Sequence, residues 1–328
     1  MTSKWSDKIF SVTPAGFEPM ALEIFRFQYE QNPVYHSYVN ALSVDPSIVD
    51  KLEKIPFLPI SFFKTHEIKT GSFEADAVFV SSGTTQAGNS LHFVKDLSVY
   101  STGFTKCFEN FYGTVKDWCI IGLLPSYLER SNSSLIYMVS HLVKNGHHPE
   151  SGFYLDEYDK LFTTLQKLEE SGQKTLLIGV TFALLDFADK YSLSLKNTFV
   201  METGGMKGKK EEMTREQVHT ILRKAFSLEK IHSEYGMTEL LSQAYSEGDG
   251  VFQTPSWMKI LIRDEDDPLQ VGKDANNGGA LNIIDLANVY SCSFIATEDV
   301  GRLYPDGSFE VLGRIDGSDM RGCGLLVI

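Results

Sequence analysis

Two uninterrupted apolar segments, residues 118–124 and 175–180, constrain the fold of this chain more than any other feature. A strand with one face in water alternates apolar and polar residues, whereas a strand buried on both faces of a parallel sheet is apolar throughout. Helix-like stretches flank both segments, among them 134–144 and 156–171. This alternation predicts an α/β fold, with helices on the faces of a mixed or parallel sheet.

The pattern of apolar and turn-forming residues in the sequence changes after about residue 248. Three short strand-like segments, at 257–262, 280–285 and 308–312, are separated there by Gly, Asp and Asn turns. We therefore expect an α/β region at 1–247 and a small β-rich subdomain at 248–328.

Local patterns predict the other elements. Pro56 and Pro59 disfavour a helix, so residues 55–64 are expected to be extended. The aromatic residues between 14 and 54 are expected in the core. The remaining predicted elements are a strand at 77–80, a helix at 97–111, a strand at 196–202 and a helix at 209–225.

Composition narrows the class of partner. The 328 residues include 43 acidic and 30 basic side chains, a formal net charge of -13. This charge argues against nucleic acid or an anionic membrane surface and favours a small molecule or a protein. The four cysteines are far apart with no CxxC pair, which argues against a disulfide framework or a zinc site and predicts a reduced, cytoplasmic protein. No run reaches the roughly 18 apolar residues of a membrane span, so none is expected.

A hydroxyl-rich loop at 81–88 follows the strand at 77–80. It holds four hydroxyls and two glycines in eight residues. Glycines let backbone N–H groups turn toward an anion and hydroxyls add donors, so the loop could hold phosphates without a Walker lysine. Taken alone, an ordinary surface turn explains it as well. The candidate residues are Ser81, Ser82, Gly83, Thr84 and Thr85.

Three further polar motifs lie downstream. Tyr235, Thr238 and Glu239 place an aromatic ring, a hydroxyl and a carboxylate within five residues, a set that could stack a base, touch a phosphate and bind Mg²⁺. A structural turn is the alternative. Asp299 could accept both hydroxyls of a ribose, and Arg314 could bridge sugar and phosphate. Taken singly, Asp299 could be an acidic residue of an ordinary turn and Arg314 a solvent-exposed basic residue.

The order and spacing of these four motifs resemble an enzyme of the adenylate-forming (ANL) superfamily over roughly residues 78–323. Within it, the segments at 58–64, 90–92 and 313–323 are similar to the acyl-protein synthetase (LuxE-type) family. The resemblance implies the large adenylate-forming N-terminal domain, with the β-rich subdomain at its end. The separate C-terminal domain of larger relatives, with its catalytic lysine, has no counterpart here.

The resemblance also implies roles for single residues. The loop from Ser81 to Thr85 would hold the ATP phosphates, and Gly204 and Gly205 would lie by the nucleotide and acyl pocket. The other implied roles are adenine stacking for Tyr235, an α-phosphate contact for Thr238, Mg²⁺ for Glu239, ribose for Asp299, ribose or phosphate for Arg314, and the hinge for Asp316.

The chain departs from the superfamily pattern in the phosphate loop. Residues 86–89 read Gln-Ala-Gly-Asn, so the usual loop lysine is missing and neutralisation of pyrophosphate needs another cation. The candidates are Lys95, Lys207, Lys209 and Lys210.

Cys323 is the last candidate for a residue that takes part in the chemistry. In the resembling family a cysteine near the C-terminus carries the acyl group, because a thiolate can attack an acyl-adenylate. A buried terminal cysteine is the equally open alternative. The predicted reaction joins a carboxylic acid, expected to be fatty, with Mg·ATP and passes the acyl group to a thiol of Cys323, a partner protein or coenzyme A. The other hypothesis is a binding partner, for acyl groups or nucleotides, that has lost adenylation.

Overall fold

The computed structural model describes residues 5–82, 88–125, 132–204, 213–265, 267–272 and 278–315. They form two compact units that interleave along the chain. Unit 1 takes its residues from Met1–Phe104, Met237–Gln243 and Gln253–Asp319, and unit 2 from Thr105–Gly236 and Ala244–Phe252. The expected boundary between an α/β region and a β-rich subdomain, at residues 247 and 248, was inferred from a change in the sequence pattern and stays a prediction.

Unit 2 contains the predicted parallel sheet. The two apolar segments form β4 and β6, which pair in parallel and are buried along their whole length. Only β9 runs antiparallel, against β8. The strands lie in the order β5 (Gly152–Phe153), β4 (Cys119–Leu123), β6 (Thr175–Gly179), β7 (Thr198–Glu202), β8 (His232–Tyr235) and β9 (Ala244–Ser246).

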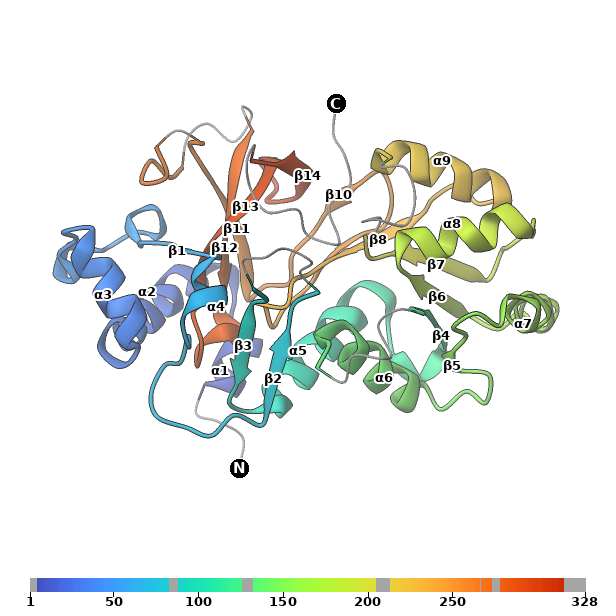
Figure 1. Cartoon of the computed structure of the whole chain (residues 1–328), viewed down its shortest axis with the longest axis horizontal. Coiled ribbons are helices and arrows are strands. Elements are labelled where there is room, and N and C mark those ends of the chain that lie inside the picture. The colour runs from blue at the N-terminus through green and yellow to red at the C-terminus, as the bar shows by residue number, and fades with distance from the viewer. Residues whose placement is uncertain are drawn as a thin grey trace. The chain divides into compact units, whose positions relative to one another are not determined.

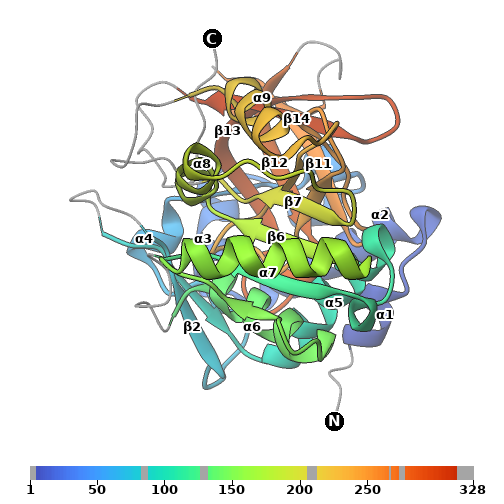
Figure 2. The same ribbon diagram turned by 90° about the vertical axis from the view of Figure 1, so that its right-hand side faces the viewer.

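Helices pack on this sheet as the alternation predicts. Helices α8 and α9 lie side by side, α6 packs against β4, and α7 is seen lengthwise in Figure 2. Their bounds are α5 (Leu97–Tyr112), α6 (Ser134–Gly146), α7 (Tyr158–Ser171), α8 (Thr181–Lys190) and α9 (Arg215–Phe226), with the 3-10 turn η3 (Val115–Asp117) and the short strand β10 (Val251–Phe252).

Helix α9 begins at Arg215, six residues after the predicted start. Thr214 is its N-cap: the Gln217 N–H donates to the Thr214 hydroxyl, and the Thr214 N–H donates to the Gln217 side chain. This reciprocal capping box fixes the start of the helix.

Unit 1 contains an antiparallel sheet, shown at the centre of Figure 1. Its strands run in the order β14 (Phe309–Arg314), β13 (Phe294–Leu303), β12 (Gly279–Asp285) and β11 (Met258–Arg263), and β1 (Leu58–Pro59) pairs in parallel with β13. The three strands predicted after residue 248 are confirmed. The long strand β13 was not predicted, because its charged centre reads as a loop motif, although β13 pairs with the strands just before and just after it in the sequence.

The N-terminal helices of unit 1 carry the expected aromatic core, with Phe25 and Tyr35 fully buried. The expectation that 55–64 is extended throughout is wrong: β1 is extended, but a helical turn begins at Phe62, three residues beyond Pro59. A proline before a helix removes none of its hydrogen bonds. The bounds are α1 (Ser6–Phe10), α2 (Pro14–Gln31), α3 (Pro33–Ala41), η1 (Pro46–Ile48), η2 (Leu52–Lys54), α4 (Phe62–Thr65), β2 (Ala77–Val80), β3 (Leu91–Val94) and η5 (Leu286–Asn288).

None of the helices within the described ranges is both long and apolar enough to cross a membrane.

Candidate active site

The residues predicted for the site divide between the two units. Unit 1 holds Ser81, Ser82, Thr238, Glu239, Asp299 and Arg314, and unit 2 holds Gly204 and Tyr235. The division falls inside the motif that runs from Tyr235 to Glu239. Gly83, Thr84, Thr85, Gly205, Asp316, Cys323 and three candidate lysines, Lys207, Lys209 and Lys210, lie outside the described residues.

Ser81 closes the base of the hydroxyl-rich loop. Strands β2 and β3 form an antiparallel hairpin, and the loop connects them. The Ser81 N–H donates to the Ser90 carbonyl at 3.1 Å, and the Ser90 N–H donates to the Ser81 hydroxyl at 2.8 Å. The phosphate-binding candidates therefore lie on a hairpin loop whose two ends are tied together.

Buried side chains from three positions in unit 1 hold the backbone of the loop Met237–Gln243, which carries Thr238 and Glu239. His92 Nδ1 lies 2.7 Å from the Thr238 carbonyl, and Asn288 Nδ2 donates to the Glu239 carbonyl at 2.7 Å. The Leu241 N–H donates to Asp285 at 2.8 Å. These hydrogen bonds fix the backbone on both sides of the Glu239 carboxylate, which is itself 3% exposed.

The contact with Thr238 defines the tautomer of His92. A carbonyl oxygen only accepts, so Nδ1 carries the hydrogen. Burial lowers the pKa of His92, against the effects of the Thr238 carbonyl, Glu239 and Asn288, and this favours the neutral ring. Its Nε2 atom then accepts, and among the described residues neither Nε2 nor Asn288 Oδ1 has a hydrogen-bond partner.

Asp285 is the most completely surrounded carboxylate of unit 1. It is fully buried and accepts hydrogen bonds from the Leu241 N–H, the Ser242 hydroxyl at 2.6 Å and the Ala287 N–H at 3.1 Å. Burial raises its pKa to about 6, although these hydrogen bonds oppose the rise. Asp285 therefore ties the end of β12 to the loop that carries Glu239.

Asp299 and Arg314 lie directly opposite each other on the consecutive strands β13 and β14. Arg314 Nε is 3.5 Å from the Asp299 carboxylate, and another nitrogen of the guanidinium pairs with Glu298. The Nε and Nη1 atoms of Arg314 are buried without a hydrogen-bond acceptor among the described residues. Donors in this state suit the oxygens of a ligand.

Arg263 supports the strand that carries Asp299. Its buried guanidinium donates to the Leu281 carbonyl and the Asn282 side chain, both at 2.9 Å, and to the Thr297 carbonyl. The Asp299 N–H in turn donates to the Thr297 hydroxyl at 3.2 Å. The backbone of β13 is thereby held just before the predicted ribose ligand.

In unit 2, Glu202 ends β7 and holds the turn that follows it. Its carboxylate, only 2% exposed, accepts from the Gly204 N–H at 2.8 Å, the Thr181 hydroxyl at 3.2 Å and the Ser233 hydroxyl at 3.0 Å. Gly204 has φ of 75°, a conformation that costs glycine little and other residues much more. The glycine predicted to lie by the pocket thus occupies a turn that suits glycine.

Tyr235 lies at the end of β8 and is 9% exposed. Its ring centre is 5.8 Å from that of Phe252, and the Arg215 guanidinium lies 5.2 Å from the Phe252 ring centre. Arg215 Nε is also 3.4 Å from the Glu202 carboxylate. A continuous chain of contacts therefore joins Glu202 to the ring predicted to stack on adenine.

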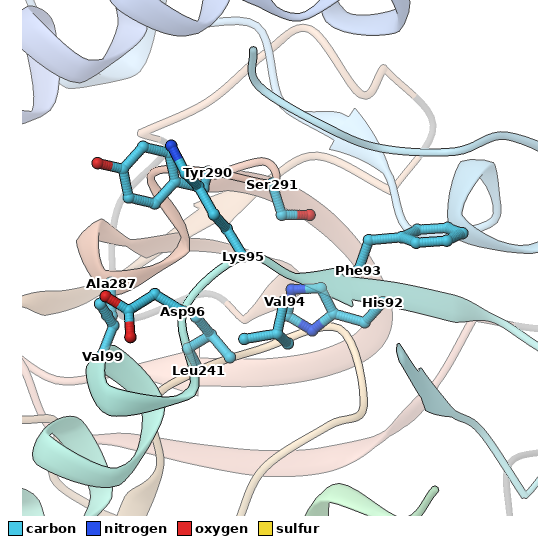
Figure 3. A pocket seen from close by; sticks show the side chains of 10 residues that line it. All are labelled: His92, Phe93, Val94, Lys95, Asp96, Val99, Leu241, Ala287, Tyr290 and Ser291. Atoms are coloured by element: carbon cyan, nitrogen blue, oxygen red, sulfur yellow. The ribbon is translucent and has the colours of Figure 1, made fainter. Parts of the chain in front are cut away.

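Lys95 is the one candidate for the missing lysine that lies within the described residues. Its ammonium is 4.0 Å from the centre of the Tyr290 ring, an arrangement visible in Figure 3, and 5.7 Å from that of Phe73. Lys95, Tyr290 and His92 line a pocket with room for about one water molecule, far below the roughly 300 Å³ of a typical ligand pocket. The contacts with Tyr290 and Phe73 thus hold the Lys95 ammonium beside aromatic rings of its own unit.

Sequence reasoning missed the residues that hold these loops. Glu202, Asp285, Asn288 and Arg263 were assigned no role, and His92 entered only as part of a resemblance. The available signal was position: Glu202 ends an apolar strand just before the Thr-Gly-Gly turn, and Asp285 ends another strand. No group of three or more His, Cys, Asp or Glu side chains that could hold a metal ion occurs in the described part of the chain.

The family model described as "Acyl-protein synthetase, LuxE" matches residues 14–328. The chain belongs to this family. Among curated protein sequences, none matches the chain.

Solved structures of adenylate-forming ligases share the fold. ATP-bound MatB from Rhodopseudomonas palustris is 15% identical with a TM-score of 0.56, covering 74% of this chain and 49% of its own. 2-Hydroxyisobutyryl-CoA ligase, in complex with 2-HIB-AMP and CoA, is 13% identical with a TM-score of 0.66, covering 96% of this chain and 72% of its own. The chain thus spans about half the length of MatB. Its mixed α/β fold is that of adenylate-forming N-terminal domains, with an antiparallel sheet toward the C-terminus, as the sequence predicted.

The hydrogen bonds of Asp285 predict a large loss of stability when its carboxylate is removed. Asp285→Ala leaves three buried donors without an acceptor and is expected to lower the free energy of unfolding by about 3 to 5 kcal/mol, measured by urea denaturation. Asp306→Ala is the control, because Asp306 accepts equivalent hydrogen bonds from the Ser308 N–H and hydroxyl in an exposed turn. Equal losses in the two variants would contradict the account of this loop.

Proposed function

We propose that the chain activates a carboxylic acid with Mg·ATP as an acyl-adenylate and passes the acyl group to a thiol. The substrate carboxylate attacks the α-phosphorus of ATP, the bond to the bridging oxygen breaks, and pyrophosphate leaves. A thiolate then attacks the acyl carbon, a thioester forms, and AMP leaves with the electron pair of the broken C–O bond. Membership of the acyl-protein synthetase family supports this chemistry.

The observation that carries the proposal is the state of Arg314. Two of its guanidinium nitrogens are buried without an acceptor among the described residues, and Asp299 lies opposite on the neighbouring strand. A ribose offers hydroxyls that can donate to Asp299, and its oxygens together with a phosphate can accept from Arg314. The pair therefore fits the sugar and α-phosphate of a nucleotide.

The other residues complete the assignment. Tyr235 would stack on adenine, Thr238 would contact the α-phosphate, and Gly204 with Gly205 would border the acyl pocket. Ser81, Ser82, Gly83, Thr84 and Thr85 would hold the leaving phosphates.

Glu239 would be the protein ligand of Mg²⁺. This ion typically takes one or two carboxylates and the phosphates of its substrate, so a single buried carboxylate on a fixed loop fits. When bound, Mg²⁺ would offset the charge that develops on the phosphates. The chain's own contribution is alignment of the two reacting groups and fixed dipoles around them.

ATP–pyrophosphate exchange across a panel of fatty and aromatic acids tests the adenylation step. We expect exchange that depends on an added acid and is strongest with one class of chain, because adenylate formation is reversible and needs no thiol. ATP binding without exchange for any acid would contradict the proposal and favour the binding-partner hypothesis, which the missing loop lysine motivates.

Labelling with a radioactive acid tests the acceptor, for which we propose Cys323. Cys107, Cys119 and Cys292 are buried, and burial raises the pKa of Cys119 to about 11 and of Cys292 to about 12, so these thiols are poor nucleophiles at neutral pH. Covalent label should appear on the native protein and on Cys119→Ser, and should be lost from Cys323→Ser. Label retained by Cys323→Ser would exclude this cysteine and favour another acceptor.

A further inference from the structure

The groups around Glu202 come from the segments that follow three neighbouring parallel strands. Thr181 follows β6, Gly204 follows β7, and Ser233 lies within β8, two residues before Tyr235. All three donate to the one carboxylate. The carboxyl ends of the strands are where open α/β sheets bind their ligands. Glu202 thus joins three neighbouring segments at the ligand-binding edge of its sheet.

The carboxylate also has two basic neighbours on α9. Arg215 Nε lies 3.4 Å and His219 Nε2 lies 3.6 Å from Glu202 Oε1. Burial by itself would raise the pKa of Glu202, but His219, Arg215 and the Gly204 N–H lower it to about 2. The side chain is therefore ionised throughout the neutral range, and its two oxygens are saturated with donors.

Stability alone does not explain this arrangement well. Buried ion pairs are often replaced by packed apolar side chains with little loss, so their presence is weak evidence for a stabilising role. An apolar residue at 202 would, however, leave the Gly204 N–H without its acceptor and remove one of the hydrogen bonds that hold the turn, another being that from the Thr181 N–H to the Gly204 carbonyl at 2.9 Å. The same substitution would remove the carboxylate that Arg215 Nε contacts, and Arg215 packs on Phe252 and through it on Tyr235.

We propose that Glu202 is a positioning residue for adenylation, which keeps the Gly204 turn and the Tyr235 ring in one arrangement. Its carboxylate acts through these residues and does not itself touch the reacting groups. The inference rests on the proposed function, because it assigns Glu202 a part in the same reaction.

Glu169, on helix α7, offers a control at the other end of strand β7. Its carboxylate accepts from the Lys196 N–H at 2.9 Å, the Asn197 N–H at 3.1 Å and the Thr198 hydroxyl at 2.7 Å, at the amino end of β7. Glu169 and Glu202 thus fix opposite ends of one strand by the same chemistry. Only Glu202 does so at the end where the ligand is expected.

The test compares Glu202→Gln with Glu169→Gln in acid-dependent ATP–pyrophosphate exchange, with folding checked by circular dichroism. At saturating ATP and acid we expect kcat to fall at least about tenfold in Glu202→Gln and to stay within about twofold of native in Glu169→Gln, since small misplacements at a reaction centre are costly. A kcat for Glu202→Gln equal to that of Glu169→Gln would overturn the inference. Should Glu202→Gln not fold, Thr181→Val removes one of the three donors and is expected to lower kcat about threefold, whereas an unchanged kcat would again overturn it.

Calorimetric titration with ATP separates this inference from the proposed function. Absence of exchange in the native protein would contradict adenylation only. In that case the dissociation constant for ATP should still rise at least about fivefold in Glu202→Gln and not in Glu169→Gln, because the ring that stacks on adenine is displaced. Equal dissociation constants would then overturn the role of Glu202.

Discussion

Buried carboxylates at the ends of strands are the interaction on which both halves of the predicted site depend. Glu202 ends β7 in unit 2, and Asp285 ends β12 in unit 1. Glu202 accepts four hydrogen bonds and Asp285 accepts three, and each set includes at least one from a backbone N–H of a loop that carries a predicted site residue. Such hydrogen bonds help to hold each loop in one conformation, together with those from His92, Asn288 and the backbone. These carboxylates therefore convert flexible turns into fixed positions for donors and acceptors, which a transition state with developing charge requires.

Much of the fold could be predicted because the relevant signals are local. The apolar segments became β4 and β6, and the strands after residue 248 became β11, β12 and β14. The long strand β13 was missed for a local reason: its charged centre, which includes Glu298 and Asp299, is typical of a loop, although the strand pairs with its sequence neighbours β12 and β14. The interleaving of the two units was missed because the spatial proximity of segments more than a hundred residues apart produces no periodic pattern in the sequence.

The candidate site was predictable as a set of motifs and not as an arrangement. The order of the motifs identified Asp299 and Arg314 singly, and the structure adds that they face each other across two strands. The residues that support the site, among them Asn288 and Glu202, form no motif, because their roles consist of contacts with atoms of other segments. The chain belongs to the acyl-protein synthetase family and has the fold of adenylate-forming domains. The segment that joins β2 to β3 carries no lysine between residues 81 and 90.

Amide hydrogen exchange in the ligand-free protein, followed by nuclear magnetic resonance, tests most directly whether these loops are fixed before any substrate binds. The N–H groups of Gly204 and Leu241 donate to buried carboxylates, so both should exchange at least about a hundredfold more slowly than in an unstructured peptide. Exchange within about tenfold of the unstructured rate at both amides would contradict the account, because the loops would then be held by the ligand and not by Glu202 and Asp285.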